Sequence, residues 1–190
     1  MTSSASATPL LDIARIEALL DASFPQIHSG GRSLVIEDVG YRSARVRLKT
    51  QARNIRPGGT VSGPAMFTLA DFAVYVAIIA SLGESGIEAV TTNMNINFLT
   101  KPEPRDMIAN VRLIRLGRRL SVGEAELASE GSADIVAHAI ATYALPPAPR
   151  ELAVGTEAPD FTLPDEAGRQ VTLASYRGNP TLLVFYRGSW

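Results

Sequence analysis

The first periodic stretch of the chain has a helical pattern. Five apolar residues between positions 10 and 20 recur at intervals of three or four, which places them on one helix face. They are Leu10, Ile13, Ile16, Leu19 and Leu20. Thr8 can cap this helix, and Pro9 suits its first turn. We therefore predict an amphipathic helix over residues 9–22.

Most of the remaining chain alternates with a period of two, which predicts strands. Residues 33–39 and 42–50 form a first pair around Gly40, and four more segments follow at 88–100, 106–117, 119–130 and 134–145. In the first of these four, the predicted apolar face holds Val90, Thr92, Met94, Ile96 and Phe98. In the last of them, it holds Ile135, Ala137, Ala139, Ala141 and Tyr143.

Between the two sets of strands lies "GGTVSGPAMFTLADFAVYVAIIASL", residues 58–82. From Pro64 to Leu82 it is almost wholly apolar, with one acid, Asp71, near the middle. A stretch of this length approaches what a bilayer span needs. A carboxylate at mid-span is costly in lipid, and no second such segment follows, so the pattern favours a buried helix.

The order of elements predicts an α+β fold. Strands joined by short turns form antiparallel sheets, and a helix that is apolar on most sides belongs against the concave face of such a sheet. "PPAPRELAVG" then has the composition of a linker. We predict a helical segment over 1–29, the sheet-and-helix domain over 30–146, a linker over 147–154 and a short segment over 155–190.

Composition narrows the function classes. The chain has 190 residues, is 46% hydrophobic and carries a net charge of −1, so no basic excess indicates a nucleic-acid partner. It has no cysteine, which removes thiol nucleophiles and the usual zinc and iron–sulfur sites. We expect no metal, no cofactor and no membrane partner, and, because no leader is recognisable, a cytoplasmic location by default.

One motif in the apolar stretch is similar to that of a known family. "RPGGTVSGPAMFTLAD", residues 56–71, resembles the Asn-Pro-x-Gly-x-x-His-Gly-Gly motif and following helical Asp of the phenylacetyl-CoA thioesterase-like family of acyl-CoA thioesterases. That family has the hot-dog fold, an antiparallel sheet wrapped around one long helix. The resemblance covers about residues 30–145, and it includes "VTTNMNINFLTKP" and "LGRRLSVGEAELAS", a strand and a basic hairpin.

Three positions depart from the family motif. Ser62 stands where the family has His, Pro64 stands for its second Gly, and Arg56 stands for its Asn, while Asn54 lies two residues earlier. Ser62 offers a hydroxyl in place of an imidazole. The alternative is that it only caps the helix, as a loop Ser before a helix commonly does.

The resemblance implies the chemistry of thioester hydrolysis. Asp71 would be the base or nucleophile, the Gly63 backbone N–H at the helix N-terminus would be the oxyanion donor, and Thr91 would help to place the water or thioester. Thr68 and Tyr75 would be pocket walls or supporting groups. The alternatives are that Asp71 lies on a solvated helix face with Thr68 and Tyr75, and that Thr91 is an ordinary strand residue.

The resemblance also implies where coenzyme A binds. Arg118 and Arg119 lie in the basic hairpin, and arginine suits phosphate because its fork is bidentate and permanently charged. An ordinary basic hairpin is the alternative. Asn54 and Arg56 complete the predicted substrate-binding residues, and His138 is predicted to be structural.

We therefore predict an acyl-CoA thioesterase for a small aromatic or medium-chain acyl group. It would be a homodimer or homotetramer in which the loop of one subunit faces Asp71 of another. Coenzyme A belongs to the substrate, so no cofactor is implied. A non-hydrolytic acyl-CoA-binding module is the first alternative, and a remnant attached to a redox domain is the second.

The last segment is similar to a different family. "APDFTL", "AGRQVTLASYRG" and "LLVFYRGSW" resemble the start of a peroxiredoxin or thioredoxin-like domain. Without a cysteine there is no thiolate to react with peroxide, so we predict no peroxidase activity for these residues. About 36 residues cannot bury a full core. "TLLVFY" is therefore predicted to be an exposed strand that needs a partner, unless the chain is a fragment of a longer fusion.

Overall fold

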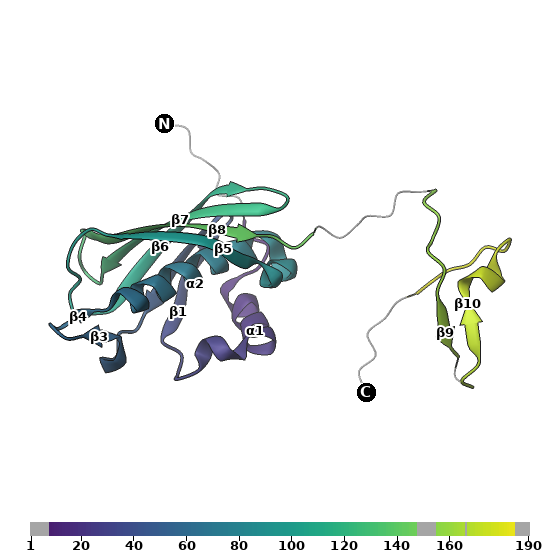
Figure 1. Cartoon of the computed structure of the whole chain (residues 1–190), viewed down its shortest axis with the longest axis horizontal. Coiled ribbons are helices and arrows are strands. Elements are labelled where there is room, and N and C mark those ends of the chain that lie inside the picture. Colours follow the sequence, from purple (N-terminus) through teal and green to yellow (C-terminus); the bar gives the residue numbers. More distant parts are fainter. Residues whose placement is uncertain (1–7, 148–154, 166, 185–190) are drawn as a thin grey trace. The chain divides into compact units, whose positions relative to one another are not determined.

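The computed structural model describes residues 8–147, 155–165 and 167–184. The chain divides into two compact units, Met1–Ala148 and Pro149–Trp190 (Figure 1). The predicted linker, residues 147–154, lies outside the described residues from 148 onward.

A six-stranded antiparallel sheet forms one layer of the first unit, in the order β1-β2-β6-β7-β8-β5 (Figure 1). Its strands are β1 (Leu34–Gly40), β2 (Ser43–Leu48), β5 (Val90–Phe98), β6 (Met107–Leu116), β7 (Leu120–Ser129) and β8 (Ile135–Ala144). The predicted antiparallel sheet is confirmed, and β1 and β5 are its edges.

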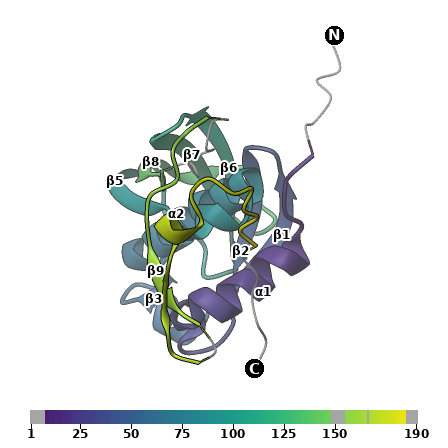
Figure 2. The same cartoon turned by 90° about the vertical axis from the view of Figure 1, so that its right-hand side faces the viewer.

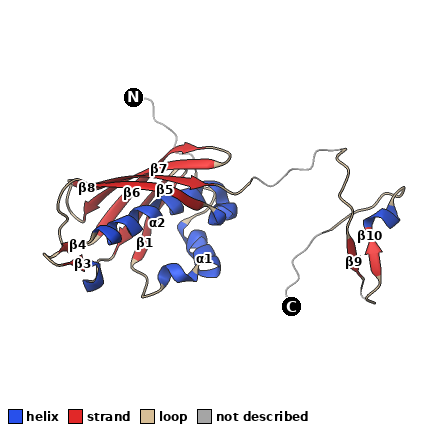
Figure 3. Cartoon of the chain, in the orientation of Figure 1, coloured by secondary structure: helices blue, strands red, loops and turns tan. Residues whose placement is uncertain are grey.

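The long helix α2 (Gly63–Leu82) packs on this sheet (Figure 3). Ser62 caps it, since its Oγ accepts a hydrogen bond from Ala65 N–H at 3.4 Å, and Pro64 occupies the second helical position rather than the first. Gly83 ends the helix with φ of 73°, a conformation that strains any residue with a β-carbon. Helix and sheet together form the arrangement of the hot-dog fold.

The same helix accounts for the apolar stretch of the sequence. Within the described residues, the segment Gly63–Glu88, which adds η3 (Gly83–Glu88) to α2, is long and apolar enough to cross a membrane. However, 67% of its most apolar window is buried inside the protein. Its apolar surface is therefore covered by the core of the unit.

The first helix, α1 (Ile13–Ser23), begins later than predicted. Asp12 caps it, because its side chain accepts a hydrogen bond from Arg15 N–H at 2.8 Å. An Asp in an extended conformation caps a helix at least as well as Thr, so the prediction of Thr8 as the cap is wrong. Ile16 and Leu20 are buried as predicted, and α1 packs beside α2 and β1 (Figure 2).

A β-bulge in β5 reverses part of the predicted alternation. The register of β5 against β8 shifts directly after Thr91, and a bulge inserts one extra residue that moves the following side chains to the other face. Met94 and Ile96 pack against the core as predicted. Thr92 is exposed instead, and Thr91 takes the inward position. Val90, before the bulge, is also exposed, at 62%. The predictions for Val90 and Thr92 are therefore wrong.

The last strand of the sheet follows its predicted pattern with one exception. Its buried face runs from Ala137 to Tyr143, whereas Ile135 is exposed and Val136 is buried in its place. The register of β7 against β8 also shifts here. An irregularity at the strand's beginning therefore changes which residue enters the core.

The segment before α2 is more ordered than the predicted loop. It contains η2 (Ala52–Asn54) and a short ladder of β3 (Ile55–Arg56) with β4 (Thr60–Val61). Gly58 and Gly59 turn the chain between these strands with φ of 98° and 73°, values that glycine adopts without strain. The turn returns the chain to the helix N-terminus.

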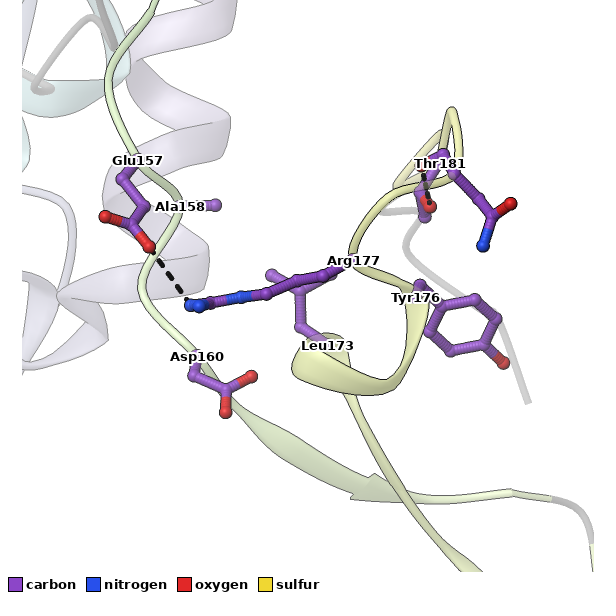
Figure 4. Close-up of a pocket in the computed structure, with 8 residues that line it drawn as sticks. Glu157, Ala158, Asp160, Leu173, Tyr176, Arg177 and Thr181 are labelled. Atoms are coloured by element: carbon purple, nitrogen blue, oxygen red, sulfur yellow. Dashed lines mark hydrogen bonds and ion pairs between the residues drawn. The ribbon is translucent and has the colours of Figure 1, made fainter.

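The second unit contains a hairpin of β9 (Thr162–Pro164) with β10 (Gln170–Thr172), followed by η4 (Leu173–Tyr176). Figure 4 shows Glu157 paired with Arg177 at 3.0 Å beside η4. The predicted strand "TLLVFY" is not formed at residues 181–184, and its last two residues lie outside the described part. A strand needs a hydrogen-bonded neighbour, and the described residues place none beside this segment.

Candidate active site

The Asp71 carboxylate is held by two hydroxyl groups. Its Oδ1 accepts hydrogen bonds from Thr91 Oγ1 at 2.9 Å and from the Tyr143 hydroxyl at 2.6 Å. Its Oδ2 accepts no hydrogen bond from the described residues. One oxygen therefore fixes the carboxylate, and the other is available to a bound water or substrate.

The sheet register explains why both hydroxyls reach the same oxygen. Thr91 on β5 lies directly opposite Tyr143 on β8. The bulge after Thr91 turns its side chain toward α2, where Asp71 lies half-buried. Bulges of this kind often re-aim a side chain next to an active site.

Tyr143 was missed as a site residue by the sequence analysis, which placed it only on the core face of a strand. It is 2% exposed. Burial, and then the Asp71 carboxylate, raise the pKa of Tyr143 well above its usual value, so its hydroxyl stays protonated and donates. The available signal was its place as the one tyrosine on that face, at the strand end that can pair with Thr91.

Tyr75 supports this arrangement rather than contacting the carboxylate. Its ring stacks on that of Tyr143, with centroids 6.3 Å apart and planes 8° from parallel. Its hydroxyl donates to the Ile87 carbonyl at 2.6 Å, and burial raises the pKa of Tyr75 to about 12. Tyr75 also lines the cavity beside Asp71, so the geometry fits both predicted roles, a supporting group and a pocket wall.

Asp71 borders a cavity of about 280 Å³, which we call the Asp71 cavity. Most of its other walls are apolar or aromatic. The lining residues are Phe24, Ile27, Thr68, Asp71, Phe72, Tyr75, Ala89, Val90, Thr91 and Tyr143. The structure thus brings together four predicted site residues and adds two, Phe24 and Ile27, from the segment after α1.

Other predicted residues lie elsewhere. Asn54 lines a second cavity of about 350 Å³, the Asn54 cavity, but its Oδ1 accepts a hydrogen bond from Gln51 N–H at 2.9 Å in a local cap. Thr68 borders both cavities, with its hydroxyl donating to the Pro64 carbonyl at 3.0 Å. Arg56 is exposed and borders neither cavity.

Gly63 and Asp71 are not brought together within one chain. They lie eight positions apart in α2, which corresponds to about 12 Å along the helix axis. The Gly63 N–H donates to no acceptor among the described residues, as expected in a first helical turn. The Ser62 hydroxyl is engaged in the cap, which is the alternative left open by the sequence.

The predicted phosphate-binding arginines share a surface depression of about 450 Å³ between β6 and β7. Arg115, which the sequence analysis missed, borders it together with Gly117, Arg118, Arg119 and Leu120. None of the three arginines pairs with a carboxylate of the described residues. Three free guanidinium groups around one depression favour a polyanionic ligand.

The arrangement can perform base or nucleophile chemistry at Asp71. A fixed carboxylate with one free oxygen beside an apolar cavity can take a proton from water or attack a carbonyl carbon. Among the described residues, no group of three or more His, Cys, Asp or Glu side chains is placed to hold a metal ion. In the described part of the chain, the His138 ring approaches the Glu124 carboxylate, at 3.8 Å.

Tyr143→Phe should lower turnover by about tenfold with little change in the Michaelis constant. It removes the hydroxyl that donates to the Asp71 carboxylate and, at 2.8 Å, to the Asp71 main-chain carbonyl. A hydrogen bond to a charged group contributes roughly 1.5–3 kcal/mol, and the ring and its stacking remain. Tyr75→Phe is the matched control, because it removes a hydroxyl that does not touch Asp71. Steady-state kinetics on both variants check this, and equal losses would contradict a role through Asp71.

Two different protein families match the two units of the chain. The model of the thioesterase superfamily matches residues 58–136, and that of the AhpC/TSA family matches residues 154–190. No curated protein matches the chain.

Several solved structures are similar to the first unit. A candidate thioesterase from Silicibacter sp. TM1040 is 41% identical, with a TM-score of 0.65, and the match covers 75% of this chain and 97% of that one. A candidate thioesterase related to phenylacetic acid degradation, from Ralstonia eutropha JMP134, is 25% identical over 69% of this chain and 98% of that one, with a TM-score of 0.60. Zebrafish thioesterase superfamily member 2, 20% identical with a TM-score of 0.59 over 74% of this chain and 100% of that one, shows the fold alone.

Proposed function

We propose that this chain, which belongs to the thioesterase superfamily, hydrolyses an acyl-CoA with a small aromatic or medium-chain acyl group. The observation that carries the proposal is the Asp71 carboxylate, fixed through Oδ1 and free at Oδ2, beside an apolar cavity. In the reaction, water adds to the thioester carbonyl, the carbon–sulfur bond breaks, and a carboxylic acid and the coenzyme A thiol are released.

The four residues predicted to be catalytic each have a role in this reaction, and Tyr143 joins them. Asp71 takes the proton of the attacking water or attacks the carbonyl carbon itself. Thr91 and Tyr143 hold Asp71 in orientation through its Oδ1. The Gly63 N–H, at the positive end of the α2 dipole, stabilises the oxyanion, and Ser62 keeps that helix end in place.

The site is proposed to be shared between two copies of the chain. The separation of Gly63 and Asp71 along α2 supports this, because one chain cannot bring the two to a single carbonyl. Most of this helix is buried, but it exposes Phe67 at 41%, and the edge strand β5 exposes Phe98 at 52%. Exposed apolar groups of this kind on an unpaired sheet edge favour association, and we propose a homodimer or homotetramer.

The arginines of the β6–β7 turn are proposed to hold the phosphates of coenzyme A. Arg118→Ala/Arg119→Ala should raise the Michaelis constant for acyl-CoA by about tenfold, since two exposed ion pairs of roughly 0.5–1 kcal/mol each amount to about one power of ten. The matching acyl-pantetheine, which lacks those phosphates, should be nearly unaffected. Arg105→Ala, which removes a charge at the opposite end of β6, is the control. Equal losses on both substrates would mean that the pair is structural.

A non-hydrolytic acyl-CoA-binding module is the second candidate. The observation that favours it is the Ser62 hydroxyl, which replaces the family's imidazole and is occupied by the helix cap. Such a module would bind acyl-CoA through the same cavity and the same arginines but would not hydrolyse its thioester.

Steady-state hydrolysis across a panel of acyl-CoA substrates tests the proposal directly. We expect turnover with at least one small aromatic or medium-chain acyl-CoA, and a dimer or tetramer by light scattering at micromolar concentration. If the protein binds several acyl-CoAs without hydrolysing any of them, the binding-module candidate replaces the thioesterase proposal. A strict monomer would count against the shared site.

A further inference from the structure

The Asp71 cavity and the Asn54 cavity share three lining residues, Phe24, Ile27 and Thr68. Side chains that line two neighbouring cavities form the wall between them. Thr68 belongs to α2 and is tied to its own helix through the Pro64 carbonyl. The removable part of the wall is therefore supplied by Phe24 and Ile27, outside the helix and sheet.

The wall is held in place by main-chain hydrogen bonds. Phe24 N–H donates to the Leu20 carbonyl at 2.8 Å at the end of α1. Ile27 N–H donates to the Phe24 carbonyl at 3.1 Å within η1 (Pro25–His28). These two hydrogen bonds fix the backbone that carries both side chains, and they connect the wall to the end of α1.

The volume of the Asp71 cavity limits what lies beside the carboxylate. At about 280 Å³, it is smaller than the roughly 300–1,000 Å³ of pockets that take drug-sized ligands. It can hold an acyl group but not the coenzyme A part of the substrate. Its aromatic walls Phe24, Phe72 and Tyr75 suit a flat ring.

The Asn54 cavity lies on the other side of the wall and has an apolar floor. Leu34, Leu48 and Ala65 are buried there. Polar residues complete its rim, namely Gln26, Ser29, Ser33, Arg53 and Asn54. A hydrocarbon chain that passed the wall would find apolar contacts in this space. Phe24 and Ile27 lie between this space and the Asp71 cavity.

We propose that Phe24, supported by Ile27, is the specificity-determining residue of the acyl site. It closes the Asp71 cavity and restricts the acyl group to a single ring or a short chain. This inference rests on the proposed function in that it takes the Asp71 cavity as the acyl site. It narrows the substrate class, because medium chains would have to cross the wall.

The test measures acyl-length preference with and without the wall. Hydrolysis of acyl-CoAs of stepwise increasing length is followed in the parent and in Phe24→Ala, and the affinities of non-hydrolysable S-alkyl-CoA thioethers of the same lengths are measured by calorimetry. In the parent, affinity should stop rising at a short chain. In Phe24→Ala it should keep rising by about fourfold for each added methylene, the equivalent of ~0.8 kcal/mol per buried CH₂.

Matched variants separate the wall from other effects. In Phe24→Ala/Ser29→Phe, a ring introduced into the Asn54 cavity should abolish the gain for long chains. Tyr41→Ala removes an aromatic side chain of similar exposure, 43% against 38% for Phe24, that lines neither cavity, and it should keep the parent profile. Phe24→Leu keeps an apolar side chain at this position and should give an intermediate length limit, so it tests the wall even if Phe24→Ala folds poorly.

The outcomes distinguish this inference from the proposed function. Hydrolysis by the parent with a length profile that Phe24→Ala does not change overturns the wall alone. An equal loss of free coenzyme A and thioether binding in Phe24→Ala also overturns it, because the wall would then contact coenzyme A. A length limit that shifts in thioether binding without any hydrolysis supports the wall and overturns the enzyme. No thioether binding by the parent overturns both.

Discussion

Asp71→Asn is expected to lower turnover by roughly two to four powers of ten, the contribution of a positioned general base, while acyl-CoA still binds. The amide keeps the size of the carboxylate. Thr91 and Tyr143 both donate to Oδ1, and both hydrogen bonds are kept when the amide oxygen lies there. The NH₂ group then takes the place of Oδ2, and it cannot accept a proton from water.

Kinetics and thermal unfolding together check this expectation. The melting temperature should stay the same or rise, since a partly buried charge is removed. Asp38→Asn, at an exposed position of β1, is the control and should keep full activity. If Asp71→Asn hydrolyses thioesters as fast as the parent, Asp71 is not the base and the binding-module candidate gains support.

The regular parts of the fold followed from periodicity in the sequence. The strand predicted over residues 42–50 is an example, because Ala44, Val46 and Leu48 alternate with charged residues along β2 and all three are buried. The apolar run after Pro64 predicted the central helix. These patterns are readable because a buried face must be apolar along its whole length. The resemblance to hot-dog thioesterases, which is confirmed by the matching family and structures, supplied the arrangement of sheet and helix.

Local irregularities were not predicted, because they depend on tertiary pairing. The bulge after Thr91 is a register shift between β5 and β8, and no residue in "VTTNMN" marks it. Asp12 displaced Thr8 as a cap because both are good caps and the packing of α1 decides between them. In the second unit, residues 181–184 have strand composition, but the described part offers no neighbouring strand to pair with.

The residues of the candidate site also fall into two groups, those that the sequence predicted and those that it did not. Asp71 was found because a lone carboxylate interrupts an apolar helix, and this signal lies in the sequence itself. Tyr143 and Phe24 were missed because each looks like an ordinary core or loop aromatic. Their relation to Asp71 arises from strand pairing and from the return of the chain after α1. Residues that act through long-range contacts leave no local pattern.

Gly63→Pro is expected to lower turnover by roughly two to three powers of ten relative to Gly63→Ala, as removing one oxyanion donor does. A β-carbon at Gly63 would lie 3.2 Å from Phe98 Cζ, and both variants introduce it. Only proline removes the N–H. Proline suits a first helical position, and the extended conformation of Ser62, with φ of −76° and ψ of 151°, is one that a following proline allows. Equal activity of the two variants would mean that Gly63 N–H is not the donor.

Mixing inactive subunits tests whether the donor and the base come from different chains. Gly63→Pro carries an intact Asp71, and Asp71→Asn carries an intact Gly63. If the site is shared across a two-fold interface, each mixed dimer has one site with both groups intact. Coexpression of the two variants should then restore about a quarter of the parent activity, because about half of randomly formed dimers are mixed and one of their two sites works. If each chain forms its own site, every site in the mixture lacks one group, and coexpression should restore nothing above the activity of the separate variants.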